Sequence, residues 1–175
     1  MIRNGGFTLI EMMITIAIVA ILAALAAPSL QQLVINNRIV SDTNLLIGDL
    51  ALARGEALKR GARVTVCTSS DGATCTGGTD WSAGRLVFVD EGVAGTVDGN
   101  DGDAAHVLRV ISALNNNNMN ETTGFSTPGY VSFFSTGFSS SGGALTVCHS
   151  GSVGRNVSIS VTGRTTVAQT AGSCP

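Results

Sequence analysis

The feature that most constrains this chain is a long apolar segment near its start that carries a single carboxylate. After the polar stretch Met1–Gly6, residues 7–35 contain few polar side chains, and Glu11 is the only charged residue among them. An apolar stretch of this length is typical of a helix that crosses a membrane. A carboxylate in hydrocarbon is costly unless a partner compensates for its charge, so Glu11 is a candidate functional residue.

Composition supports a membrane segment followed by one modest domain. Of 175 residues, 44% are hydrophobic and only 13% are charged, and the mean hydropathy is +0.34. Without the N-terminal helix about 115 residues remain, which is enough for one small core. The net charge of −2 provides no general positive field for nucleic acid, so any DNA binding would need a local basic patch.

The four cysteines predict two disulfide bonds. No C-x-x-C pair occurs and the chain has only two histidines, so zinc-ligand spacing is absent and we expect no metal. Behind an export signal, an even number of cysteines indicates disulfides. We expect Cys67 to pair with Cys75 and Cys148 with Cys174. Three pairings are open on the sequence alone, and free buried thiols are the alternative.

The apolar segment is expected to begin one long, curved helix from Thr8 to about Arg60. An ordinary secretory signal is the alternative, because Ala23–Ala27 resembles a cleavage site. Glu11 within the apolar run and the helical pattern beyond Pro28 oppose that alternative. Pro28 removes a backbone donor and clashes with the preceding turn, so a bend or local melting is expected there.

Residues 36–61 form an amphipathic second half of this helix. Apolar residues recur there at spacings of three, four or seven: Ile39, Leu46, Leu50, Ala53 and Ala57. The charged side chains mostly fall off this stripe: Arg38, Asp49, Arg54, Lys59 and Arg60. Gly61 supplies a C-terminal stop. The stripe predicts packing on a globular domain, whereas residues 7–35 must protrude.

Residues 62–175 are expected to form a β-rich head. Seven short strands are separated by Gly- and Ser-rich turns: Arg63–Thr68, Arg85–Asp90, His106–Ile111, Tyr130–Phe134, Ala144–Cys148, Asn156–Val161 and Thr165–Gln169. Asn115–Asn118 and Ser139–Gly143 are expected to be exposed loops. One helix followed by several strands predicts an α+β fold, with an antiparallel sheet or sandwich packed on the helix.

The start of the chain resembles a known processing signal. Gly6-Phe7-Thr8-Leu9-Ile10-Glu11 is similar to the type III signal of type IV prepilins and type II secretion pseudopilins. In that family a membrane-embedded prepilin peptidase cuts after the glycine and methylates the new amino terminus. The resemblance implies a leader peptide at residues 1–6, cleavage between Gly6 and Phe7, and an N-methylated Phe7. Pro28 falls where many pilins have a helix-bending proline.

A second resemblance, to the GspH/FimT branch of pilin-like proteins, covers most of the chain. The residues that carry it are Ala53-Arg54, Glu56-Ala57, Arg60-Gly61, Val64–Cys67, Cys75, Trp81, Gly84–Asp90, Leu145–Cys148 and Gly163-Arg164. It implies a minor pilin or minor pseudopilin near the filament tip, with no cofactor. The implied partners are prepilin peptidase, other filament subunits and the bacterial inner membrane. The head would lie in the periplasm, or outside on the assembled filament.

The resemblance also implies a role for Glu11. Cleavage makes the amino group of Phe7 a cation at membrane depth, and in the family one subunit's acid pairs with a neighbour's amine during assembly. Two such charges offset each other's desolvation. The alternative is an acid that only reaches toward the interface, in a single-span protein that never polymerises.

Two binding functions are weaker alternatives. Some FimT relatives bind DNA through a Gly-Arg-x-Arg motif, but here Thr166 replaces the second arginine. Arg155 and Arg164, with Arg109 possible nearby, would be the DNA contacts. The acidic stretch Asp90–Asp103 departs from the EF-hand pattern, which favours a hairpin turn over a calcium site.

No catalytic function is expected. The histidines lie in no motif, Ser139–Ser141 has no nucleophile elbow, and no small-molecule substrate is indicated. The sequence does not separate a secretion role from a pilus role.

Overall fold

The computed structural model describes residues 7–97, 106–114 and 118–174. One helix, α1 (Leu9–Arg60), precedes eight strands. Their bounds are β1 (Val64–Thr68), β2 (Arg85–Val89), β3 (Val107–Ile111), β4 (Asn118–Thr123), β5 (Tyr130–Phe133), β6 (Gly143–Cys148), β7 (Val153–Ile159) and β8 (Thr165–Ser173). The expected α+β fold is therefore confirmed.

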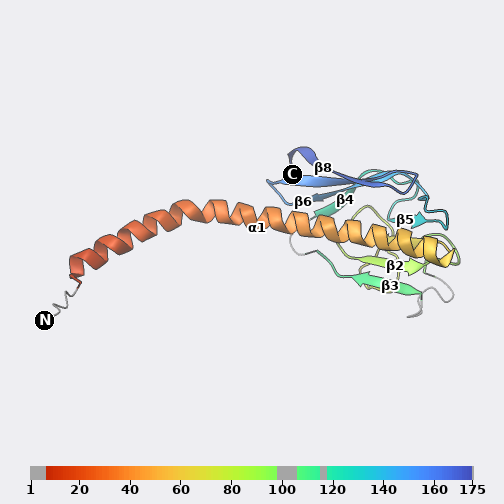
Figure 1. The fold of residues 1–175 in the computed structure, drawn as a ribbon, viewed down its shortest axis with the longest axis horizontal. Coiled ribbons are helices and arrows are strands. Elements are labelled where there is room, and N and C mark those ends of the chain that lie inside the picture. The colour runs from red at the N-terminus through yellow and green to blue at the C-terminus, as the bar shows by residue number, and fades with distance from the viewer. Residues whose placement is uncertain (1–6, 98–105, 115–117, 175) are drawn as a thin grey trace.

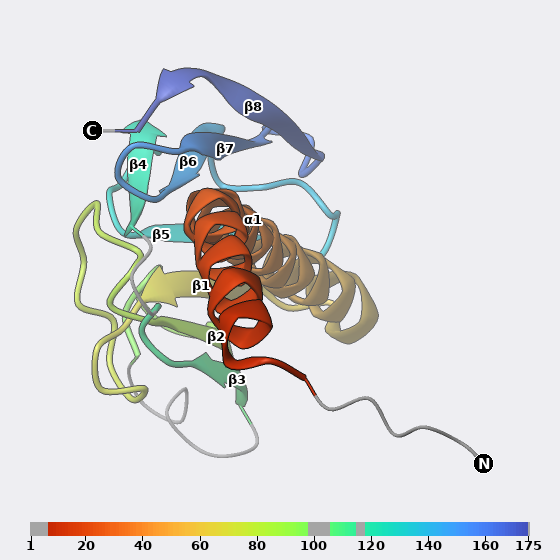
Figure 2. The same ribbon diagram turned by 90° about the vertical axis from the view of Figure 1, so that its left-hand side faces the viewer.

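The strands form two antiparallel sheets on two sides of α1. Sheet A has the order β3-β2-β1-β5 and sheet B the order β4-β6-β7-β8. Figure 1 shows the C-terminal half of α1 lying between the sheets while the N-terminal half protrudes from the head. Figure 2, with the protruding half toward the viewer, shows sheet B above the helix and sheet A on the other side.

The predicted apolar stripe is the face that α1 buries in this head. Ile39, Leu46, Leu50, Ala53 and Ala57 are all at most 1% exposed. They join buried side chains of both sheets in one hydrophobic core, which also contains Trp81. Because a stripe of this spacing lies on one side of a helix, it fits a helix that is half covered. Gly61, with φ 67°, then ends the helix, and its N–H donates to Ala57 O at 3.0 Å.

Pro28 does not interrupt α1. The helix is continuous from Leu9 to Arg60, so local melting does not occur, and Figure 1 shows the protruding half bent relative to the half on the head. The ring of Pro28 leaves one carbonyl of the preceding turn without its helical donor. No tertiary contact within the described head depends on this turn, so the loss of one helical hydrogen bond leaves the packing of the head unchanged.

The strand prediction was wrong in two places. Asn118 starts β4 instead of belonging to a loop, and β4 pairs with β6 over most of its length. Ser139 and Ser141 were expected to be exposed but are only 3% and 7% exposed. Burial is tolerated because Ser139 Oγ donates to the carbonyls of Ser141 and Ser160, at 2.9 and 2.8 Å.

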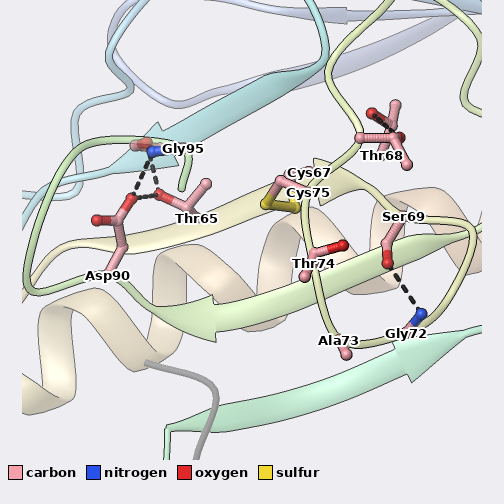
Figure 3. Close-up of a disulfide and its surroundings, with 12 residues drawn as sticks. Thr65, Cys67, Thr68, Ser69, Gly72, Ala73, Thr74, Cys75, Asp90 and Gly95 are labelled. Atoms are coloured by element: carbon pink, nitrogen blue, oxygen red, sulfur yellow. Dashed lines mark hydrogen bonds between the residues drawn. A yellow bond between two sulfur atoms is a disulfide. The ribbon is translucent and has the colours of Figure 1, made fainter. Parts of the chain in front are cut away.

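Two disulfides stabilise the head, one closing the loop after β1 and the other fixing the C-terminal end of β8 to β6. Cys67 of β1 is bonded to Cys75, and Cys148 of β6 is bonded to Cys174 after β8. These are the two pairs expected from the sequence. The first closes a loop whose turn is held by a hydrogen bond from Gly72 N to Ser69 Oγ at 3.0 Å (Figure 3).

Asp71 organises the same loop from its centre. Its carboxylate accepts hydrogen bonds from the backbone N–H groups of Thr74 and Ala73, at 2.8 and 2.9 Å, and from the Thr74 hydroxyl. Because these bonds stabilise the charged form, led by that from the Thr74 N–H, they hold the pKa of Asp71 well below its usual range. The loop therefore keeps a charged Asp71 at any physiological pH.

Candidate assembly site on the protruding helix

Thr8 caps the start of α1, two residues after Gly6 of the proposed cleavage junction. Its backbone is extended, with φ −82° and ψ 152°, and its hydroxyl oxygen accepts a hydrogen bond from Glu11 N at 3.3 Å. This is the geometry of an N-cap, which satisfies one of the free N–H groups at a helix start. Phe7 lies just before the cap and is 79% exposed. Gly6 and the rest of the leader lie outside the described residues.

The protruding half of α1 exposes apolar side chains on all sides. It is long and apolar enough to cross a membrane. Its most apolar stretch of 18 residues has a mean hydropathy of 2.6, and none of these residues is buried in the head. Exposures of large side chains range from 79% at Phe7 to 43% at Val34. Such a surface needs either lipid or the helices of other subunits around it.

Glu11 is the single charged side chain on this apolar surface. It is exposed, and in the described part of the chain it accepts no side-chain hydrogen bond and forms no ion pair. A carboxylate placed in hydrocarbon or between packed helices needs a cation or a donor. Within the described chain none is supplied, so its partner must come from elsewhere. A cationic amine at Phe7, in this chain or a neighbour, has the required chemistry.

The head contains a buried ion pair that the sequence pattern did not predict. Asp49 was placed off the packing stripe, but it is 1% exposed and both its oxygens are paired. Arg85 Nη2 donates to Oδ2 at 2.9 Å, and Arg109 Nη1 donates to Oδ1 at 3.1 Å. Arg85 is itself fully buried within β2. The sequence did contain a signal for this pair: Arg85 is the one charged residue of the otherwise apolar strand Arg85–Val89. A charged side chain buried in such a strand needs an acidic partner.

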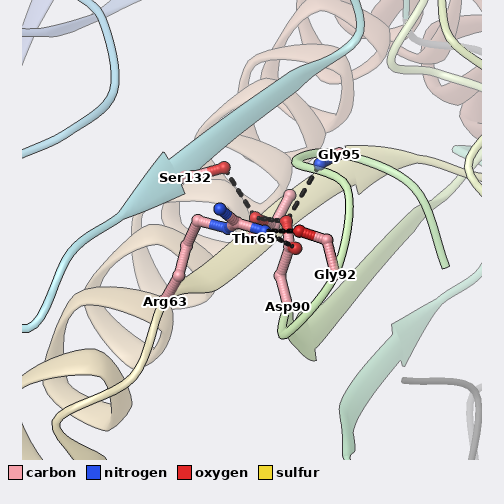
Figure 4. Close-up of polar contacts among 6 residues, drawn as sticks. All are labelled: Arg63, Thr65, Asp90, Gly92, Gly95 and Ser132. Atoms are coloured by element: carbon pink, nitrogen blue, oxygen red, sulfur yellow. Dashed lines mark hydrogen bonds and ion pairs between the residues drawn. The ribbon is translucent and has the colours of Figure 1, made fainter. Parts of the chain in front are cut away.

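A second polar cluster connects the segment after α1, sheet A and the loop after β2 (Figure 4). Arg63, directly after the helix, forms an ion pair with Asp90 and donates to Gly92 O at 2.5 Å. Thr65 Oγ1 donates to Asp90 Oδ2 at 2.5 Å, and Gly95 N donates to the same oxygen at 2.9 Å. Asp90 therefore fixes the loop after β2 to Arg63 and to Thr65 of β1. The other acidic positions of the calcium hypothesis, Asp98 to Asp103, lie outside the described residues.

The candidate DNA-contact arginines do not come together. Arg155 in β7 lies beside residues 32–40 of α1, whereas Arg164 lies beside residues 47–58, which are centred about 25 Å further along the helix axis. Arg109 belongs to sheet A and its guanidinium is committed to Asp49. The described head therefore has no cluster of these three cations, whereas non-specific DNA binding relies on several phosphate contacts made together.

Comparison with known proteins identifies the family. Residues 42–163 match the family described as type II transport protein GspH, and residues 1–27 match the prokaryotic N-terminal methylation motif. The chain is 40% identical over 83 residues to fimbrial protein Q of Moraxella bovis, an alignment that covers 42% of this chain and 50% of that protein. It thus spans about half the length of this relative.

Solved structures share the fold. The type IV minor pilin FimU of Pseudomonas aeruginosa superposes with a TM-score of 0.58 at 20% identity, over 78% of this chain and 96% of that one. The minor pseudopilin EpsH from the type 2 secretion system of Vibrio cholerae gives 0.51 at 13% identity, over 75% and 96%. The match over residues 42–163 extends across most of the chain, from the packed half of α1 to the turn before β8. The chain therefore belongs to the GspH family.

Proposed function

We propose that this chain is a minor pilin or pseudopilin, a structural subunit that enters a type IV pilus or a type II secretion pseudopilus near its tip. The observation that carries the proposal is the exposed apolar helix on which Glu11, shortly after the Gly6–Phe7 junction, has no partner among the residues that the structure describes. Membership of the GspH family and the match to the N-terminal methylation motif support it.

Processing supplies the missing partner of Glu11. Prepilin peptidase cuts between Gly6 and Phe7 and methylates Phe7, which creates a cationic amine at the end of the apolar helix. When a subunit enters the filament, its Glu11 pairs with the Phe7 amine of a neighbour. Breaking a buried pair of this kind costs about 3–5 kcal/mol, which is enough to exclude most subunits from the filament.

The same proposal places the head in the periplasm before assembly. Its two disulfides fit an oxidising compartment, and Arg3 before the apolar segment fits a cytoplasmic leader. The helix then serves as a single membrane span within residues 7–35. Genes for secretion or for pilus biogenesis beside its own gene distinguish the two filament types.

Replacing Glu11 tests this function. Glu11→Ala leaves a methylated Phe7 at the mature N-terminus, which mass spectrometry detects, but reduces the chain in sheared filaments at least about tenfold, as expected for loss of a buried pair. Thr15→Ala, one turn further along the same surface, is the matched control and is incorporated normally. Normal incorporation of processed Glu11→Ala would exclude the pairing mechanism.

A further inference from the structure

The boundary between membrane and head can be located along α1. The apolar run from Leu9 to Leu30 is about 22 residues long and spans about 33 Å, close to the roughly 30 Å of hydrocarbon in a bilayer. Gln31 and Gln32 are the first amide side chains after it, and Asn36 follows one turn later. When the helix spans a membrane, the turn from Gln32 to Asn36 therefore lies at the level of the lipid headgroups.

The head already reaches α1 at this level. Gln32 Nε2 donates to Ser152 Oγ at 3.2 Å, in the turn between β6 and β7. Beside this bond, a groove of about 350 Å³ lies between α1 and sheet B. The helix contributes Gln32, Asn36, Ile39 and Val40, and the sheet contributes the start of β7 and Gln169 of β8. Figure 1 shows this end of β8, near the C-terminus, on the side of the head from which the helix protrudes.

Arg155 gives this groove its charge. By strand alternation it shares the inner face of β7 with the core residues Val157 and Ile159, but it lies beyond them at the edge of the core. Gln169 is its register partner on β8. Across the described ranges, the guanidinium of Arg155 has neither an acceptor nor an ion-pair partner. A half-buried arginine without an acceptor is suited to bind an anion.

We propose that this groove binds the phosphate of a membrane phospholipid headgroup while the subunit is held in the membrane. The inference rests on the proposed membrane-stored state of the subunit. Arg155 contacts the phosphate, and the amides of Asn36 and Gln169 supply further donors. Ile39, Val40 and the 49% exposed Val153 provide apolar walls. Phospholipid phosphates are concentrated at the level of Gln32 to Asn36, which favours a lipid headgroup over a free phosphate ion as the occupant.

Bound lipid would fix the head against the membrane surface. The groove joins α1 to the edge of sheet B, so a headgroup seated there contacts both the helix and the head. Leaving the membrane for the filament then requires release of this lipid. Arg155 thereby has a role in the stored subunit that differs from DNA binding and does not need Arg164.

Native mass spectrometry of the full chain in a neutral detergent tests the site. Phosphatidylglycerol is titrated into the wild-type chain, Arg155→Gln, and the matched control Arg164→Gln. Wild type and Arg164→Gln retain bound lipid, and Arg155→Gln binds it about tenfold more weakly, as expected for one lost charge-assisted contact. Thermal unfolding of the three chains coincides, because neither guanidinium holds a partner in the described structure.

Two further arms identify the ligand chemistry. A galactolipid with the same acyl chains but no phosphate should not remain bound, and excess inorganic phosphate should not displace the phospholipid. Equal binding by Arg155→Gln, or equal binding of the galactolipid, would overturn the proposal. Complete displacement by inorganic phosphate would assign the site to a soluble anion. Failure here leaves the Glu11 experiment unaffected, and a chain that binds lipid but never enters filaments contradicts only the proposed function.

Discussion

At the scale of single residues, the head depends most on the carboxylate of Asp49. It receives two guanidinium groups, and its partner Arg85 has no exposed surface. Removing one member of a buried pair leaves the other charged without compensation. We expect Asp49→Ala to lower the free energy of unfolding by about 3–5 kcal/mol, measured by thermal unfolding followed by circular dichroism.

Two variants make the Asp49 prediction specific. Glu56→Ala removes a carboxylate two turns later, where Lys59 and Arg60 are solvent-exposed partners, and should change stability little. The double variant Asp49→Leu/Arg85→Met should recover most of the loss, because apolar side chains of similar volume can replace a buried pair. A loss from Asp49→Ala no larger than that from Glu56→Ala would contradict the assigned role.

The same residues show what a sequence pattern can predict. The stripe from Ile39 to Ala57 was predictable because periodic apolar residues have one burial solution on a helix. Burial of Asp49 was not predictable, because its partners come from β2 and β3, at sequence separations of 36 and 60. Similarly, Arg155 and Arg164 are nine positions apart in sequence, but the hairpin of β7 and β8 places them beside different parts of α1.

At the scale of elements, β8 is the part of the head with the least support. It is an edge strand of sheet B, it pairs with β7, and most of its residues are exposed. The Cys148–Cys174 disulfide fixes its far end to β6. Without it, an edge strand held by a single neighbour is free to fray.

Removing this disulfide should therefore act locally on β8. In Cys148→Ala/Cys174→Ala, the backbone amides of β8 should lose more protection against hydrogen exchange than those of β1 and β2, because β8 also opens locally. In the chain-entropy estimate, loss of this 26-residue loop lowers the free energy of unfolding of the chain by about 3.5 kcal/mol. Cys67→Ala/Cys75→Ala is the control and should leave β8 protected. Unchanged exchange in β8 after loss of its disulfide would show that pairing with β7 is sufficient.

Elements with strong local patterns were predicted well, and those defined by pairing were not. The long helix was located to within a residue at each end, because its apolar run and Gly61 mark it. β4, with the sequence NMNETT, carries no alternating apolar pattern and becomes a strand only because β6 lies beside it. Ser139 lies in an isolated bridge to Phe133, another non-local contact that a Gly- and Ser-rich stretch does not reveal.

At the scale of the whole molecule, one helix serves two environments. Most of its first half contributes nothing to the core of the head: its most apolar stretch is entirely exposed, and packing on the core begins at Ile35. Contact with the head begins at the Gln32–Ser152 hydrogen bond and becomes full burial at Ile39. The head should therefore be an independent folding unit whose boundary on α1 falls between Leu30 and Gln32.

Truncation measures where that boundary lies. A chain that begins at Gln31 should be soluble without detergent and should unfold within a few degrees of the full chain, since it keeps every buried helix residue. A chain that begins at Val40 loses Ile39 and the Gln32 bond, and removing a buried isoleucine costs about 2–5 kcal/mol. It should unfold at a clearly lower temperature by circular dichroism. Equal stability of the two truncated chains would mean that Ile39 and the Gln32 contact do not anchor the helix. A Gln31 chain much less stable than the full chain would instead mean that the protruding half supports the head.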